Sequence, residues 1–152
     1  MSTAPWRSSF VFTAGSIEPY RGLEDILEAV AIAHRNAAQL KLVIAGISRP
    51  SMRSYHHRLQ RWVTQHGLDA SVRWVGHLTA QEMAWCYLSC NAFVMTSRVE
   101  TFAIIGAEAL VYGCACIVAD NPPFPEVFGD AAVYYPPRNA VALADALRVA
   151  MC

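Results

Sequence analysis

The sequence FVFTAGSIEPYRGLEDILEAV, which spans residues 10–30, decides the fold class. Residues 10–14 form a short run of aromatic, β-branched and small residues, which is typical of a buried strand. A loop with glycines at both ends follows this run. The next apolar residues recur at the three- and four-residue spacing of a helix face: Leu23, Ile26, Leu27 and Val30. The segment is therefore predicted to fold as strand, loop and helix.

The same alternation continues along the chain. Further strands are predicted at residues 40–45, 72–75, 92–95, 116–119 and 132–135. A second helix is indicated by Met52, Tyr55, Leu59, Trp62 and Val63, a third by the capping box at Thr79 and Glu82, and a last one from about Ala140. Strands alternating with helices predict a Rossmann-like α/β domain, a parallel sheet of about six strands with helices on both faces.

Composition sets limits on function. The chain of 152 residues is 55% hydrophobic, which suits a single domain over residues 1–152. Twelve basic residues balance twelve acidic ones, so no overall field favours nucleic acid or an anionic membrane. The first twelve residues lack the apolar core of a signal peptide, and the odd count of five cysteines argues against a disulfide framework. These features predict a cytoplasmic protein with reduced thiols.

The segment VETFAIIGAEALVYG, residues 99–113, carries the main chemical signal. It predicts a loop bearing Glu100, then an almost wholly apolar helix that ends at Gly113. Glu108 is thus expected in a buried helix, where a carboxylate needs a dedicated hydrogen-bond partner. That partner is either a neighbouring loop or arginine, or a pair of ligand hydroxyls, and the helix pattern alone leaves both open.

In residues and spacing this segment resembles the signature of the retaining GT-B glycosyltransferases, which include bacterial mannosyl- and glucosyltransferases of polysaccharide assembly. The signature reads E-G-F-G-x-x-x-x-E-A-x-A-x-G-x-P-V, with seven residues between its glutamates. Glu100 and Glu108 occupy those positions here, and Gly113 follows. Other segments resemble the family in the same order: residues 15–22, Gly46, 75–77, 92–97, 125–127, 129–132 and Leu143-Ala144.

The resemblance implies half of a GT-B fold, the half that binds a nucleoside diphosphate sugar. Glu100 would hold the hydroxyls of the donor sugar and Glu108 those of the ribose, since one carboxylate can accept hydrogen bonds from two vicinal hydroxyls. Backbone amides at residues 102–104 would face the diphosphate. The predicted donor-binding residues are Gly15, Ser16, Arg21, Gly76, His77, Glu100, Thr101, Phe102, Ala103, Ile104 and Glu108. Glu100 and Arg21 are the predicted catalytic residues.

The sequence departs from the family pattern at several of these positions. The first donor loop of the family carries an arginine after its glycine and a lysine before the next glycine, and both neutralise the leaving diphosphate. Here Arg21 keeps a cation at the lysine position, but Ser16 stands at the arginine position. Arg7 or a partner domain is a candidate to supply that missing positive charge. Ala103 replaces a glycine that lets the backbone approach the sugar, and Thr96 replaces a proline.

Other clusters are expected to be structural. The pairs Cys86/Cys90 and Cys114/Cys116 lack the spacing of a zinc knuckle and are predicted to be buried thiols. His56 and His57 are expected on a solvated helix face, and His77 is either a nucleobase contact or a simple turn residue. No Asp-x-Asp pair is present, so neither a metal nor another cofactor is predicted.

The sequence therefore predicts the donor-binding domain of a retaining hexosyltransferase for polysaccharide or glycolipid synthesis, using a UDP- or GDP-sugar. The N-terminal acceptor domain is expected to be absent from these residues and to be supplied in cis or in trans. Any peripheral membrane association is expected to come only through that missing domain. Two alternatives stay open: a donor subunit of a split transferase, and a non-catalytic nucleotide-sugar-binding module. A dehydrogenase is disfavoured, because residues 14–22 lack the G-x-G-x-x-G dinucleotide fingerprint.

Overall fold

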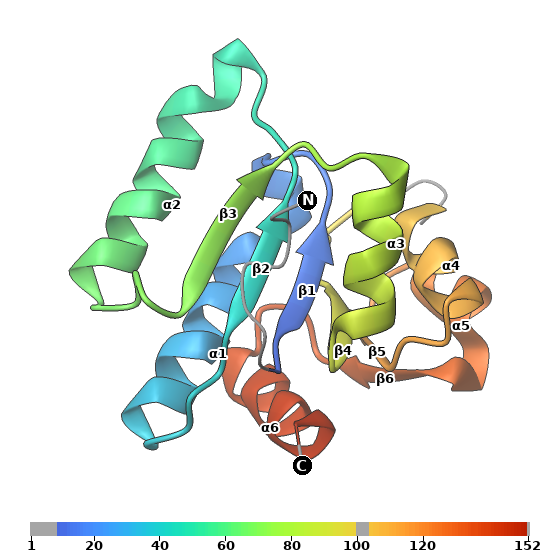
Figure 1. Ribbon diagram of the computed structural model, residues 1–152. Coiled ribbons are helices and arrows are strands. Elements are labelled where there is room, and N and C mark those ends of the chain that lie inside the picture. The colour runs from blue at the N-terminus through green and yellow to red at the C-terminus, as the bar shows by residue number, and fades with distance from the viewer. Residues whose placement is uncertain (1–8, 100–103, 152) are drawn as a thin grey trace.

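The computed structural model describes residues 9–99 and 104–151 as a single sheet with helices on both faces (Figure 1). The strands are β1 (Val11–Ala14), β2 (Leu42–Ala45), β3 (Val72–Gly76), β4 (Ala92–Met95), β5 (Cys116–Ala119) and β6 (Ala132–Tyr135). The helices are α1 (Leu23–Arg35), α2 (Arg53–Gln65), α3 (Ala80–Ser89), α4 (Ile104–Val111), α5 (Phe124–Phe128) and α6 (Ala140–Ala150). Short 3-10 turns lie at Pro19–Arg21, Pro50–Met52 and Gly129–Ala131.

The sheet is wholly parallel, with the strand order β3-β2-β1-β4-β5-β6. This is the Rossmann order, and it confirms the predicted α/β class. The predicted and observed bounds agree for β4, β5 and β6. β1 begins one residue later than predicted, β2 begins two residues later, and β3 extends one residue further, to Gly76. The edge strands β3 and β6 are only partly buried, because each has a neighbour on one side.

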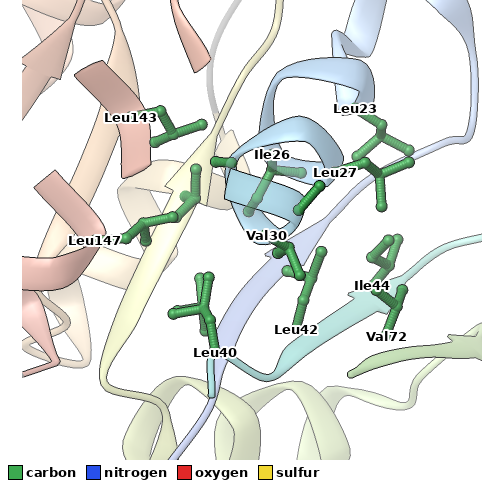
Figure 2. Packing of buried hydrophobic residues seen from close by; sticks show 14 of the residues in the cluster. Leu23, Ile26, Leu27, Val30, Leu40, Leu42, Ile44, Val72, Leu143 and Leu147 are labelled. Atoms are coloured by element: carbon green, nitrogen blue, oxygen red, sulfur yellow. The ribbon is translucent and has the colours of Figure 1, made fainter. Parts of the chain in front are cut away.

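Each face of the sheet has its own core, since successive strand residues point to opposite faces. On one face, α1, α2 and α6 pack on residues such as Leu42 and Ile44. Figure 2 shows the contribution of α1 and α6 to this core. On the other, α3, α4 and α5 cover an aromatic layer that includes Phe12 and Phe93. Figure 1 shows α1 and α6 side by side beneath the first face.

Helix ends follow the local chemistry of the sequence. The predicted capping box is confirmed: the Glu82 amide donates to Thr79 Oγ1 at 3.2 Å, and the Thr79 amide donates to Glu82 Oε1 at 3.1 Å. Asn139 caps α6 by accepting from the Ala142 amide at 3.0 Å. Among the described residues, no helix combines the length and apolar character that crossing a bilayer requires.

Candidate functional site

The site lies at the carboxyl edge of the sheet, where the strand order reverses between β1 and β4. The loop after β1 leads to α1 on one face, whereas the chain after β4 continues to α4 on the other. Loops that diverge in this way leave a crevice beyond the strand ends, and this is where parallel α/β sheets bind ligands. Two predicted donor loops, residues 15–22 and the segment after Met95, meet here.

Backbone hydrogen bonds join the loops after β1, β2 and β3 into one floor. The Gly15 amide donates to the Ala45 carbonyl at 3.1 Å, and the Gly46 amide donates to the Gly76 carbonyl at 2.8 Å. A third bond, from the Ile17 amide to the Ile47 carbonyl, measures 3.0 Å. These bonds extend the sheet pairing past the strand ends, so the three loops are held at fixed relative positions.

A cleft of about 310 Å³ opens above this floor. Its lining includes three of the predicted donor-binding residues, Gly15, Ser16 and His77. The other lining residues are small or apolar: Ala14, Ala45, Gly46, Ile47, Leu78, Met83 and Ile105. A largely apolar cleft with a few polar groups suits a flat aromatic ring joined to a polar group.

Arg21 lies against the first loop, beside the cleft. A side-chain carbon at Gly15 would lie 2.8 Å from Arg21 Cζ, so a glycine at this position lets the guanidinium lie over the loop backbone. The guanidinium also lies 5.3 Å from the centre of the Tyr20 ring. Arg21 lines a narrow pocket together with Gly15, Ser16 and Ser97, which places its cation where the two predicted donor loops meet.

Ser16, which replaces the expected arginine, is the first member of a polar chain. Its hydroxyl donates to Glu18 Oε2 at 2.8 Å, and Arg49 forms an ion pair with Glu18 Oε1 from the loop after β2. The hydrogen bond from Ser16 lowers the pKa of Glu18, and the contact with Arg49 lowers it further. Glu18 is therefore an ionised carboxylate held between a hydroxyl and a guanidinium.

The segment after β4 is fastened to the first loop. Thr96 Oγ1 donates to the Arg21 carbonyl at 2.6 Å, and the Arg98 amide donates to the Tyr20 carbonyl at 2.7 Å. On its other side, Asn121 Nδ2 donates to the Ser97 carbonyl at 2.9 Å. The residues that precede Glu100 are thus held by backbone and side-chain bonds from two neighbouring loops.

Asp25 anchors the same segment from inside the protein. Its side chain is nearly fully buried and accepts two hydrogen bonds from Arg98, at 2.6 and 2.7 Å. It also accepts from the Tyr135 hydroxyl at 2.7 Å and from the Arg138 amide at 3.1 Å. One carboxylate therefore joins α1, the segment before Glu100, β6 and the loop after β6.

The expectation that Glu108 lies in a buried helix is wrong. In α4, Glu108 is exposed, and so are Ile104 and Val111, at 63% and 85%. The buried face of α4 is formed by the small residues Gly106 and Ala109. A side-chain carbon at Gly106 would lie 2.7 Å from the Met95 sulfur and would overlap the ring of Phe128, so close packing at this contact leaves no room for a side chain.

Glu108 nevertheless has a defined partner. The Tyr87 hydroxyl lies 3.2 Å from Glu108 Oε2 and 3.1 Å from the Ile105 carbonyl, and it donates to one of these acceptors at a time. The Tyr87 ring is buried against Phe12 and Phe93. Burial, together with the Glu108 carboxylate, raises the pKa of Tyr87 and keeps the phenol protonated as a donor.

The other predicted site residues are only partly brought together. Gly76 joins the floor through its carbonyl, and Ile104 is exposed at the start of α4. Glu108 lies one turn beyond Ile104 and does not line the cleft. Glu100, Thr101, Phe102 and Ala103 lie outside the described residues.

The expectations for the cysteines and histidines hold only in part: Cys86 and Cys116 are buried, whereas Cys90 and Cys114 are only partly buried. Burial raises the pKa of Cys86 to about 11 and that of Cys116 to about 12, so both are protonated thiols. His56 is half-buried against Trp74 instead of lying on a solvated face. Within residues 9–99 and 104–151, no three His, Cys, Asp or Glu side chains gather as a metal site, and metal-independent chemistry stays a prediction.

Sequence reasoning did not identify Asp25, Arg49, Tyr87 and Arg98 as parts of the site. Asp25 resembles an ordinary acidic residue in the first turn of a helix, where such residues commonly face solvent. Arg49 and Arg98 lie in loops, where arginines are usually solvated. The one available signal was a tyrosine within the apolar run of α3, because a buried phenol normally has a hydrogen-bond partner.

Comparison with known proteins identifies the family of this chain. Residues 3–151 match the family model described as glycosyl transferases group 1. The chain belongs to this family. A relative from Xanthomonas campestris, named GDP-mannose:cellobiosyl-diphosphopolyprenol alpha-mannosyltransferase, is 30% identical over 124 residues, which cover 80% of this chain and 30% of the relative. The chain thus spans under a third of that relative's length. An uncharacterised glycosyltransferase of Bacillus subtilis is 25% identical, and the match covers 76% of this chain and 31% of that protein.

Solved structures show the same fold. The C-terminal domain of a group 1 glycosyl transferase from Francisella tularensis superposes with a TM-score of 0.81 at 22% identity, covering 92% of this chain and 74% of that one. The Anabaena protein HepE, solved with UDP and glucose, superposes with a TM-score of 0.84 at 19% identity, covering 93% and 38%. The domain therefore has the fold of the C-terminal domain of a GT-B glycosyltransferase, as the sequence predicted.

Proposed function

We propose that this domain binds the nucleoside diphosphate sugar of a retaining, metal-independent hexosyltransferase. The observation that carries the proposal is the cleft between the loops after β1, β2 and β3 and the start of α4, which joins apolar walls to the Gly15-Ser16 turn. The nucleobase would occupy the apolar part beside His77. The diphosphate would lie toward Ser16 and Arg21, where the cation offsets the charge of the leaving group.

The two signature glutamates would hold the hydroxyl groups of the donor. Glu108 is exposed near the cleft, and an ionised carboxylate there accepts hydrogen bonds from two vicinal ribose hydroxyls. Glu100 would do the same for the sugar, together with the backbone at residues 101–104. Asp25 and Arg98 support this role, because they anchor the segment that leads directly to Glu100.

The similar proteins include examples with a guanosine and with a uridine diphosphate sugar. The Xanthomonas protein is named for GDP-mannose and a diphosphopolyprenol acceptor, and HepE has been solved with UDP-glucose. For this chain we propose transfer of a hexose in polysaccharide or glycolipid synthesis. The acceptor would bind to an N-terminal GT-B domain, supplied in the same polypeptide or by a partner, and we propose that the assembled enzyme acts in the cytoplasm.

Calorimetry with UDP-glucose and GDP-mannose tests the proposal. The wild-type domain is expected to bind at least one of them, and Glu108→Ala is expected to weaken that binding by at least about tenfold, the usual range for a lost charge-assisted hydrogen bond. Glu126→Ala is the matched control, because it removes an exposed carboxylate from the neighbouring helix α5. Undiminished affinity in Glu108→Ala would refute the role of Glu108, and absence of binding by the wild type would refute the function.

Tyr87 is expected to position Glu108, and Tyr87→Phe removes its hydroxyl but keeps the buried ring. We expect donor binding to weaken by about three- to tenfold, the size of one hydrogen bond, with little change in melting temperature. In a Glu108→Ala background the same substitution should have no further effect on affinity. Additive losses in this double-mutant cycle would show that Tyr87 acts independently of Glu108.

A further inference from the structure

The first donor loop lacks a cation where its family carries an arginine, and the structure brings another cation to that point. Ser16 Oγ, Glu18 and Arg49 form a continuous chain in which one carboxylate separates the serine hydroxyl from the guanidinium. Ser16 lines the cleft, and so does Ile47, two residues before Arg49. The hydrogen bond from the Ile17 amide to the Ile47 carbonyl holds the two loops together, so this proximity is built into the backbone.

Arg49 is also free to change partners. Its side chain is 67% exposed, whereas that of Glu18 is 11% exposed and held by Ser16. The guanidinium has five N–H donors in a fork that fits phosphate, and the single ion pair with Glu18 uses few of them. An exposed arginine can therefore keep its contact with Glu18 and still donate to a phosphate oxygen, or move from one to the other at small cost.

The charge balance favours such a contact. Glu18 is an ionised carboxylate beside the Gly15-Ser16 turn, and it would repel a diphosphate there unless a cation accompanied it. Arg21 is a second cation near this turn, and its guanidinium lies against Gly15. The residues described as lining the cleft itself include no lysine or arginine.

Given the donor-binding function proposed above, on which this inference rests, we propose that Arg49 supplies the phosphate-binding cation that Ser16 lacks. The cation comes from the loop after β2 instead of the loop after β1. Arg49 is thus a diphosphate-binding residue of this domain, and without the donor it pairs with Glu18.

The test compares ligands that differ only in their phosphates. Calorimetry is carried out with uridine diphosphate and guanosine diphosphate, and with uridine and guanosine, on the wild type and Arg49→Gln. The variant is expected to bind the preferred diphosphate about tenfold more weakly and to bind the matching nucleoside within about twofold of wild type. Arg53→Gln, an exposed arginine at the start of α2, controls for the lost net charge and should bind both ligands like the wild type.

A second pair of variants separates contact with phosphate from mere neutralisation of Glu18. If Arg49 binds the phosphate, Glu18→Gln/Arg49→Gln stays weakened, whereas Glu18→Gln alone binds the diphosphate as well as the wild type or better. Recovery of wild-type affinity in the double variant would overturn the proposal, and so would unchanged diphosphate affinity in Arg49→Gln. A wild type that binds neither diphosphate would instead overturn the donor-binding function itself.

Discussion

Replacing Asp25 with alanine is expected to lower the free energy of unfolding by about 3–5 kcal/mol, the cost of breaking a buried ion pair from one side. The substitution leaves Arg98, the Tyr135 hydroxyl and the Arg138 amide without their shared acceptor. The side chain of Asp25 is 4% exposed, so water cannot replace the lost carboxylate without local rearrangement. Urea unfolding followed by circular dichroism measures the change.

Two further variants make this measurement specific. Asp25→Asn keeps the size of the side chain and one acceptor oxygen, so it should lose about half as much stability as Asp25→Ala. It therefore gives a folded variant to measure even where Asp25→Ala does not fold. Glu24→Ala, at the adjacent acidic residue in the first turn of α1, removes an exposed carboxylate that accepts one hydrogen bond, from the Tyr55 hydroxyl at 2.9 Å, so it should cost about 1 kcal/mol. A loss below about 1 kcal/mol in Asp25→Ala would show that the network around Asp25 is not an anchor.

The Asp25 variants should also weaken donor binding. Arg98 lies two residues before Glu100, and its side chain donates two hydrogen bonds to Asp25. These bonds raise the pKa of Arg98, so its guanidinium stays charged. Releasing Arg98 frees the segment that carries Glu100. Donor affinity measured in Asp25→Asn, below the onset of unfolding, should therefore fall, whereas affinity in Glu24→Ala should not.

Replacing Gly46 with alanine is expected to cost about 2–4 kcal/mol, from a strained backbone together with overpacking. Gly46 has φ +132°, a conformation that residues with a side chain rarely adopt. A side-chain carbon there would also overlap the carbonyl oxygen of Gly15. Because the Gly15 and Gly46 loops form the floor of the cleft, the substitution should reduce donor binding as well as stability.

Gly67→Ala provides the matched control for Gly46→Ala. Gly67 also has a positive φ, +68°, but it follows α2 and has no atom within 4 Å of the added carbon. It should cost about 1 kcal/mol, the usual penalty for alanine in the left-handed region, and leave donor affinity unchanged. Equal losses in the two variants would show that backbone strain, and not the contact between the two loops, governs Gly46.

Much of the fold follows from local sequence. Short runs of β-branched and aromatic residues predicted the strands to within two residues, because a strand buried on both faces must be apolar throughout. The periodicity of α1 and the capping box of α3 were local too, so both were readable. Family resemblance, carried by the spacing of Glu100 and Glu108, then indicated where a ligand would bind.

The prediction for Glu108 failed for a tertiary reason. An almost wholly apolar helix was expected to be buried, but α4 packs through its smallest residues because Met95 and Phe128 leave no room for larger ones. Composition reports how apolar a helix is. It does not report which side of that helix faces the sheet, because that depends on partners from β4 and α5 that are distant in sequence.

The sequence by itself determined the class of the domain and the positions of its strands, since these depend on local periodicity and on residues close together in the chain. Tertiary structure alone decided which charges meet. Asp25 and Arg98 are separated by 73 residues and Glu18 and Arg49 by 31, and only the parallel sheet brings each pair to the same edge. Loops far apart in sequence become neighbours there because successive parallel strands all end on that side.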